Sequence, residues 1–158
     1  MKEIKTKENS VVLTNDQKRS LELFCEWLNT PYSYNPFVMK GFAGSGKTYL
    51  SMKLLKKVDE LGLSWTVVAP THKAVGVLRE NLKNESIQPT WFPSTIHRLL
   101  RLKLKRQADA EICEKTDQTE SSLENLGRVL IDEASMIDSK LLEITLECAK
   151  CNLSLIHI

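Results

Sequence analysis

Apolar residues along this chain form short continuous runs, and between the runs they recur every three or four positions. The runs at residues 36–40, 65–69 and 129–131 have the length and apolar character of strands in a parallel sheet. Helical spacing follows the first two runs, over residues 49–61 and after residue 74. The second of these helices is predicted to bury Val75, Val77, Leu78 and Leu82. The repeated order of strand and helix predicts an α/β domain with a mostly parallel sheet.

A further helix is predicted between residue 14 and the Asn-Thr-Pro stretch at residues 29–31. Thr14 followed three positions later by Gln17 fits a capping box, in which each side chain bonds the backbone N–H of the other residue. Gln17 also has a second interpretation, because its amide can donate to and accept from the edge of an adenine base. The local sequence favours neither interpretation, so both stay open.

Residues 101–126 contain two blocks of opposite charge. Basic residues come first and acidic residues follow: Arg101, Lys103, Lys105 and Arg106, then Asp109, Glu111, Glu114, Asp117, Glu120 and Glu124. This pattern predicts a long exposed loop or a hairpin between two elements of the fold. The basic block could lie along a nucleic-acid backbone, and a simply solvated segment is at least as consistent with the sequence.

Length and composition indicate one ordinary globular domain. The chain has 158 residues, of which 42% are hydrophobic and 27% charged, enough for a single core. We expect a flexible lead-in over residues 1–10 and one domain over residues 11–158. The net charge of +2 favours no class of partner, and nothing in the sequence indicates an oligomeric state.

No apolar run is long enough to cross a bilayer, and the N-terminus is charged rather than signal-like, so we expect no membrane partner. Four cysteines without a secretion signal indicate reduced thiols in the cytoplasm, or in the nucleus of a eukaryote. Cys148 and Cys151 form a C-x-x-C pair, but no second pair completes a zinc site. We therefore interpret both as incidental small apolar positions.

The strongest motif lies between the first predicted strand and the helix that follows it. Residues 41–48 read Gly-Phe-Ala-Gly-Ser-Gly-Lys-Thr and fit the phosphate-binding pattern G-x-x-x-x-G-K-[ST]. Backbone N–H groups of such a loop converge on the phosphates of a bound nucleotide. Lys47 would reach the β- and γ-phosphates of that nucleotide, and the Thr48 hydroxyl would bind Mg²⁺. The nucleotide contacts predicted here are Gly41, Ala43, Gly44, Ser45, Gly46, Lys47, Thr48 and Tyr49. This motif predicts a protein that binds a nucleoside triphosphate.

A second motif closes the apolar run at residues 129–131, where Asp132 and Glu133 follow in succession. Mg²⁺ prefers oxygen ligands, so Asp132 is predicted to hold the metal opposite Thr48. Glu133 is then placed to orient the water that attacks the γ-phosphate and to take its proton. The pair predicts hydrolysis of the nucleotide rather than passive binding.

Two further clusters suit a second anion, such as the phosphate of a nucleic acid. One directly follows the run at residues 65–69, and the other follows a Ser-Thr pair at residues 94–95. Their candidate contacts are Pro70, Thr71, His72, Lys73, Thr95 and His97. For the first cluster the alternative is an N-cap threonine with solvated neighbours, and taken by itself that alternative has more weight. Lone histidines are also more often structural than functional.

Taken together, these blocks resemble the first motor domain of superfamily 1 DNA helicases. The resemblance rests on Leu-Thr-x-x-Gln, the phosphate-binding loop, Ala-Pro-Thr-His-Lys-Ala, Ser-Thr-Ile-His and Val-Leu-Ile-Asp-Glu-Ala-Ser-Met, in this order. It extends over nearly the whole chain, and the last three blocks are similar to the RecD-like and Dda-like branch, which moves 5′ to 3′ on single-stranded DNA. It implies a three-layer RecA-like P-loop NTPase fold.

The resemblance also implies a role for each block. Gln17 would recognise adenine, Lys47 the phosphates, and Glu133 would be the catalytic base. Mg²⁺ would lie between Thr48 and Asp132, and Ser135 would help couple the nucleotide site to DNA. The clusters after residues 69 and 94 would lie along single-stranded DNA. The expected cofactors are therefore ATP and Mg²⁺, and the expected partner is single-stranded DNA.

One departure from the family matters for activity. Helicases of this class continue into a Gly-Asp-x-x-Gln segment and a second motor domain, and nothing similar follows Ile158. We therefore expect a fragment that binds ATP but hydrolyses it poorly, since an arginine supplied by the second domain contributes about 10³ to 10⁵ in rate. The alternatives are a nucleotide-dependent DNA-binding module without turnover, or another P-loop ATPase.

The resemblance finally implies a sheet order. RecA-like sheets insert one strand between the strand of the phosphate-binding loop and the strand of the acidic pair. Here only residues 153–158 can supply it, although this run could also be foreign to the domain. We predict that it pairs in parallel with residues 37–39 on one side and residues 129–131 on the other, and so sets the separation between Lys47 and Asp132.

Overall fold

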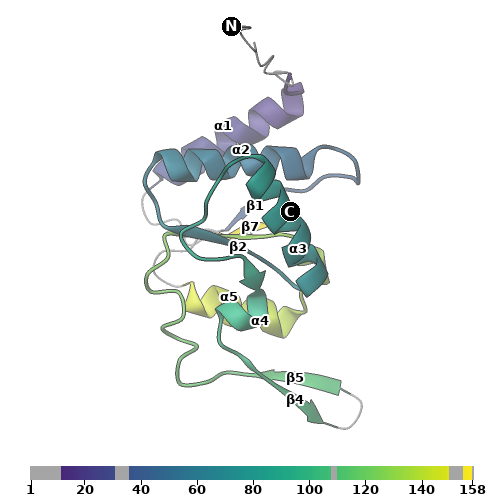
Figure 1. Ribbon diagram of the computed structural model, residues 1–158, viewed down its shortest axis with the longest axis vertical. Helices are drawn as coiled ribbons and strands as arrows, with labels where there is room; N and C mark the ends of the chain where they lie inside the picture. The colour runs from purple at the N-terminus through teal and green to yellow at the C-terminus, as the bar shows by residue number, and fades with distance from the viewer. Residues whose placement is uncertain (1–11, 31–35, 108–109, 150–154, 158) are drawn as a thin grey trace, which may run out of the picture.

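The computed structural model describes residues 12–30, 36–107, 110–149 and 155–157 (Figure 1). Expectations for the N-terminal lead-in and for Cys151 lie outside the described residues. Within those residues the chain forms a five-stranded sheet, helices on both faces of the sheet, and a separate two-stranded hairpin.

The strands of the main sheet lie in the order β1, β7, β6, β2, β3, and every neighbouring pair is parallel. Their bounds are β1 (Phe37–Val38), β2 (Trp65–Ala69), β3 (Ser94–Thr95), β6 (Arg128–Ile131) and β7 (Leu155–His157). The predicted parallel α/β sheet is therefore confirmed.

Helices cover both faces of this sheet, as a three-layer fold requires. They are α1 (Asn15–Asn29), α2 (Lys47–Glu60), α3 (His72–Asn84), α4 (Ile96–Leu99) and α5 (Ser139–Cys148), with a short 3₁₀ turn η1 (Ala134–Met136). Figure 1 shows α1 and α2 on one side of the sheet, with α4 and α5 on the other. None of the helices in the described part of the chain is long and apolar enough to span a bilayer.

The apolar runs become strands because their alternate side chains enter two different cores. Val67 and Ala69 of β2 pack with α1, α2 and α3, whereas Val68 packs with α4 and α5. In β6, Leu130 joins the first core and Ile131 joins the second. Since successive residues of a strand point to opposite faces, a strand buried on both faces must be apolar throughout.

The predicted capping box at the start of α1 is present. The Thr14 hydroxyl accepts a hydrogen bond from the backbone N–H of Gln17, and the Gln17 side chain accepts one from the backbone N–H of Thr14. Near its end the helix packs Phe24 against Trp27 and against Phe37 of β1, with ring centroids 5.4 and 5.2 Å apart. These aromatic contacts fix α1 beside the strand that leads into the phosphate-binding loop.

Two expectations about burial and length need correction. Val77 is 52% exposed, although it was predicted to lie on the buried side of α3. Each residue turns a helix by about 100°, so Val75, Leu78 and Leu82 share one face, and Val77 points away from it. The first strand is also shorter than predicted, because only Phe37 and Val38 make ladder bonds at this edge of the sheet.

The prediction for the last strand is confirmed over its described part. β7 lies between β1 and β6 and pairs in parallel with both, with Ile156 opposite Phe37 on one side and Leu130 on the other. Within the described residues β1 and β6 have no direct pairing, so β7 separates them by one strand. The remainder of the predicted run lies outside the described residues.

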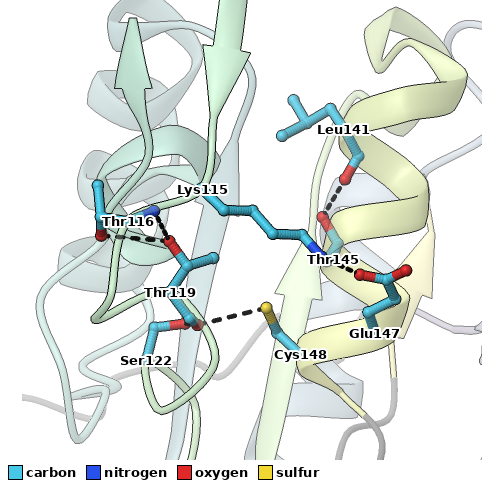
Figure 2. Close-up of polar contacts among 8 residues, drawn as sticks. All are labelled: Lys115, Thr116, Thr119, Ser122, Leu141, Thr145, Glu147 and Cys148. Carbon is cyan, nitrogen blue, oxygen red and sulfur yellow. Dashed lines mark hydrogen bonds and ion pairs between the residues drawn. The ribbon is translucent and has the colours of Figure 1, made fainter.

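The charged segment forms the predicted hairpin, with β4 (Lys103–Gln107) antiparallel to β5 (Ala110–Glu114). Figure 1 shows it extending away from the sheet. Figure 2 shows how the chain after the hairpin is tied to α5: Lys115 pairs with Glu147, and the Cys148 thiol donates to the Thr119 carbonyl at 3.3 Å. Burial raises the pKa of the Cys148 thiol, which fits the interpretation of Cys148 as a small apolar position.

Replacing Ile156 with proline tests the position of β7. Proline has no N–H, and inside a sheet it leaves a neighbouring carbonyl unpaired, so Ile156→Pro should lower the free energy of unfolding by about 1–3 kcal/mol or more. Ile156→Val keeps the N–H and should lower it much less. Urea unfolding followed by circular dichroism measures both, and equal stability of the two variants would place β7 outside the sheet.

Candidate functional site

The topology brings the two nucleotide motifs to one edge of the sheet. The phosphate-binding loop follows β1, and Asp132 directly follows β6. Val38 and Ile131 lie on either side of His157 in β7. Neighbouring strands are about 4.8 Å apart, so the two motifs start about 10 Å from each other. A nucleotide with its metal fits between groups at this separation.

The residues predicted to bind nucleotide lie together in the loop and the first turn of the next helix. Gly41, Ala43, Gly44 and Ser45 are exposed, Gly46 is the N-cap of α2, and Lys47, Thr48 and Tyr49 form its first turn. The structure therefore places all of these predicted contacts on one continuous surface, with the N-terminus of α2 in its midst. A helix N-terminus with free N–H groups favours an anion.

At two of its glycines an added side chain would meet neighbouring side chains at short distance. A Cβ on Gly46 would lie 2.6 Å from Nε2 of Gln17, and Gly46 adopts a left-handed conformation with φ of +79°. A Cβ on Gly41 would lie 2.7 Å from the Ser45 hydroxyl oxygen. The backbone is thus the lining of the loop, which is what close approach to a phosphate requires.

Lys47 reaches back over this loop. Its ammonium donates to the carbonyl of Gly41 at 2.7 Å and to that of Phe42 at 2.8 Å. An ammonium has three N–H donors, so two are held by the loop and one remains for a phosphate oxygen. The charge of Lys47 is therefore already positioned at the mouth of the loop.

Gln17 joins α1 to the same loop, 28 positions away in the sequence. Besides its capping bonds, its Nε2 donates to the Ser45 carbonyl at 3.1 Å. The capping interpretation is confirmed, and adenine recognition stays a prediction. The two are compatible, because a glutamine amide has two donors and two acceptor sites and only one of each is used.

Asp132 and Glu133 differ in their surroundings. Asp132 is half-buried, and burial raises its pKa above the ordinary value; the N–H of Glu133, 3.0 Å from Oδ1, and the Lys47 ammonium act in the opposite direction. Glu133 is exposed and has φ of +53°, a left-handed conformation that is strained for a residue with a Cβ. This bend separates the two carboxylates, one held inside the edge of the sheet and one at the surface.

Oxygen ligands for Mg²⁺ are present both in the phosphate-binding loop region and at the end of β6. Thr48 supplies a hydroxyl and Asp132 a carboxylate, which are ligands that this hard cation prefers. No group of three or more histidine, cysteine or acidic side chains in the described residues could hold a metal by itself. This donor set fits Mg²⁺, which commonly binds through one or two protein oxygens together with phosphates and water.

The predicted DNA contacts lie at the same edge, beyond the next strands. Ala69 of β2 pairs with Thr95 of β3, so Thr71 and His97 each follow a paired position by two residues. Pro70, Thr71 and His97 are partly exposed, His72 and Lys73 are exposed, and Thr95 is buried. The two clusters are therefore neighbours on the edge that also carries the nucleotide motifs.

Both threonines act as helix N-caps. The Thr71 hydroxyl accepts from the N–H of Ala74 at 3.2 Å, and the Thr95 hydroxyl accepts from the N–H of Arg98 at 3.4 Å. The capping alternative is thus confirmed for Thr71 and applies also to Thr95. A hydroxyl that accepts one bond still has its proton to donate, so capping does not exclude a phosphate contact.

The contact between Gln17 and Ser45 and the bend at Glu133 were not predicted. No local pattern indicates the first, because it joins residues that only the packing of α1 on α2 brings together. A left-handed glutamate has no signal in the sequence either. Both features concern how the site is held in place rather than which residue types it contains.

The protein-family comparison matches residues 27–156 to a family described as "AAA domain". This chain belongs to that family. The matched part of the AAA domain contains the phosphate-binding loop, the acidic pair, both threonine clusters and the first two residues of β7.

One relative and several solved structures are also similar to this chain. "Uncharacterized protein R530" of Acanthamoeba polyphaga mimivirus is 35% identical over 119 residues, which cover 68% of this chain and 24% of the relative. An unliganded Pif1 from a Bacteroides species is similar in fold, with a TM-score of 0.59 at 18% identity over 93% of this chain. A Bacteroides Pif1 bound to single-stranded DNA has a TM-score of 0.55 at 19% identity over 94% of this chain.

The AAA domain thus has the fold expected from its resemblance to superfamily 1 helicases, and the predicted three-layer RecA-like P-loop fold is confirmed. The chain spans about a quarter of the mimivirus relative and 32% of each of these two Pif1 chains.

Asp132→Asn should stabilise the AAA domain at neutral pH in the absence of nucleotide and magnesium. Burial raises the pKa of Asp132, so its ionised form is disfavoured in the folded state. This penalty is absent below the unfolded-state pKa of about 3.9, where both states are protonated. It grows as pH rises from that value to the raised folded-state pKa and is constant above it. Asparagine removes the charge and keeps an oxygen for the Glu133 N–H.

Urea unfolding at neutral and at acid pH measures this effect. The gain in the free energy of unfolding should be present at neutral pH and should vanish at acid pH. Glu143→Gln, which neutralises an exposed carboxylate on α5, serves as the control and should change stability little. A destabilised Asp132→Asn variant at neutral pH would contradict the expected burial of the carboxylate.

Proposed function

We propose that this chain is the ATP-binding motor domain of a DNA helicase that couples ATP hydrolysis to movement on, or unwinding of, DNA. The observation that supports the proposal most is the placement of four motifs along one edge of a parallel sheet. The nucleotide motifs follow β1 and β6, and the candidate DNA contacts follow β2 and β3. Solved Pif1 helicases of similar fold include one with ADP-AlF4 and one with single-stranded DNA.

In the nucleotide site each group binds one part of ATP or takes part in its hydrolysis. The loop N–H groups and Lys47 bind the phosphates of ATP, and Gln17 receives the adenine edge. Thr48 and Asp132 would hold Mg²⁺, and this cation would supply positive charge to neutralise the phosphates of ATP. Glu133 orients a water molecule and takes its proton at the side-chain carboxylate.

In the DNA site the two threonine clusters bind the backbone of a single strand. Thr71 and Thr95 donate their hydroxyl protons, while His72, Lys73 and His97 add positive or polar groups. Pro70 shapes the chain between β2 and the first cluster. Ser135 lies in η1, directly after the acidic pair, where it couples the nucleotide site to the strand. The blocks around these residues favour the RecD-like and Dda-like branch.

The proposal also includes a second motor domain in the whole protein. A second motor domain would supply arginines to the same ATP, and its contribution of about 10³ to 10⁵ in rate would make turnover by this chain alone slow. The proposed compartment is the cytoplasm, or the nucleus if the source is a eukaryote, where cysteines stay reduced.

Lys47→Ala should lower the affinity for Mg-ATP by at least about tenfold, because a charged hydrogen bond to phosphate contributes on the order of 1.5–3 kcal/mol. Isothermal titration calorimetry measures the affinity. Lys57→Ala is the matched control: it removes a lysine from the same helix, at a partly exposed position where the ammonium pairs with Glu60. Unchanged binding by Lys47→Ala would mean that the loop is not a phosphate site.

Thr71 allows capping and DNA contact to be separated. Asparagine and aspartate both cap helices well, so Thr71→Asn and Thr71→Asp should leave stability nearly unchanged. Aspartate also places a negative charge against the DNA backbone, so Thr71→Asp should weaken binding of labelled oligothymidine more strongly than Thr71→Asn. Fluorescence anisotropy over a range of salt concentrations measures this, since contact with phosphates makes binding salt-dependent. Equal affinity of both variants would remove Thr71 from the DNA path.

A further inference from the structure

A groove of about 640 Å³ lies beside β3, outside the two sites described above. We call it the arginine groove, and six of its lining residues matter here: Arg79, Trp91, Phe92, Ser94, Arg98 and Arg101. Its described lining contains no carboxylate. Three cations and two aromatic rings thus share one concave surface, without an acidic side chain to neutralise them.

The arginines are held in place by neutral groups rather than by acids. Arg79 of α3 donates to the Pro93 carbonyl at 2.7 Å, and Arg101 donates to the side-chain oxygen of Gln118 at 3.0 Å. A guanidinium has five N–H donors, so most donors of both remain for a ligand. Arg98 of α4 is exposed beside them. Because a guanidinium matches the geometry of phosphate oxygens, such a set favours a phosphate ligand.

Phe92 is presented to solvent by a backbone fixed on both sides. Its side chain is 91% exposed, which is unusual for a phenylalanine. On one side the Trp91 carbonyl accepts from the Thr66 hydroxyl of β2 at 2.8 Å, and on the other the Pro93 carbonyl accepts from Arg79. The exposed ring therefore belongs to an anchored segment, which makes it a suitable platform for stacking.

Arg101 is also held in its position at some cost. It adopts a left-handed conformation with φ of +53°, which is unfavourable for a residue with a Cβ. Its N–H donates to the Arg98 carbonyl at 3.1 Å, and its carbonyl accepts from the Thr116 hydroxyl at 2.9 Å. These bonds fix the turn between α4 and the hairpin, and with it the place of Arg101 in the groove.

We propose that the arginine groove binds a nucleotide of the same single-stranded DNA, with its base stacked on Phe92 and its flanking phosphates on Arg98 and Arg101. The inference rests on the proposed DNA function and adds a base-contacting platform to a path otherwise made of backbone contacts. Ser94 lines the groove and directly precedes Thr95, so the groove continues the line of the second threonine cluster. Stacking on an aromatic face is tolerant of sequence, as a motor on DNA requires.

Binding of labelled oligothymidine by the full chain, followed by fluorescence anisotropy, tests the groove. Phe92→Ala should weaken binding on the order of tenfold through loss of one stacked base. Arg98→Ala should lower the slope of log affinity against log salt by about 0.7, the value for one phosphate contact on a single strand. Both side chains are exposed, so neither change should alter the thermal unfolding midpoint.

Two matched controls lie away from the groove. Leu61→Ala removes an exposed apolar side chain after α2, and Arg19→Ala removes an exposed arginine from α1. Neither should change affinity as much as its counterpart in the groove. As a second readout, ultraviolet crosslinking of an oligonucleotide that carries iododeoxyuridine should label the peptide with Trp91 and Phe92.

The possible outcomes separate this inference from the proposed function. If wild-type protein binds DNA and Thr71→Asp weakens it, but Phe92→Ala and Arg98→Ala bind like their controls, the groove is not part of the path. Crosslinks that map elsewhere overturn it in the same way. If wild-type protein does not bind single-stranded DNA at all, the proposed function fails, and the inference fails with it.

Discussion

The backbone pairing of β7 is the constraint on which the nucleotide site depends. Two of its described residues pair with β1 on one side and three pair with β6 on the other, and each partner strand leads into a motif of the site. A strand in the middle of a sheet has its N–H and C=O groups paired on both sides, so its neighbours cannot approach or separate freely. The distance between the loop after β1 and Asp132 is therefore set by a segment that carries no proposed catalytic group.

The same sheet connects the nucleotide site with the candidate DNA contacts. The backbone N–H of Asp132 donates to the Val68 carbonyl of β2 at 2.9 Å, and β2 leads directly to Thr71. Val68 pairs also with Ser94 at the start of the second cluster. A shift of Asp132 on binding or loss of a phosphate would act on the backbone of the strand that positions both threonines. The proposed coupling between the nucleotide site and the DNA contacts would therefore pass through three neighbouring strands, β6, β2 and β3.

Local sequence predicted those parts of the molecule that depend on short-range rules. Continuous apolar runs identified β2 and β6 because both faces of these strands are buried, and the spacing of Thr14 and Gln17 identified the start of α1. The position of β7 came from the resemblance to a known family, since three or four apolar residues do not specify their neighbours in a sheet. The length of the first strand was overestimated, because an edge strand of two residues leaves no distinct pattern.

The arrangement around the motifs was beyond the sequence. Gln17 and Ser45 meet only because α1 packs on α2. Val77 was wrongly predicted to be buried, because the sequence of a helix does not distinguish an exposed valine from a buried one. The arginine groove combines residues of α3, of the segment before β3 and of the turn after α4, whose proximity no spacing indicates. Residue types at a site follow from its chemistry, whereas the contacts that hold them follow from tertiary packing.

The hydrogen bonds from Lys47 to the carbonyls of Gly41 and Phe42 affect the entropy that the loop loses when it binds a ligand. A flexible glycine-rich loop would have to become ordered whenever a ligand arrived, and each side chain so immobilised costs about 0.5–1.5 kcal/mol. Here the ammonium already crosses the loop and holds it in a curved shape, together with the amide of Gln17 on the Ser45 carbonyl. The loop is in this sense preorganised, and most of the entropy that binding would otherwise remove is lost when the domain folds.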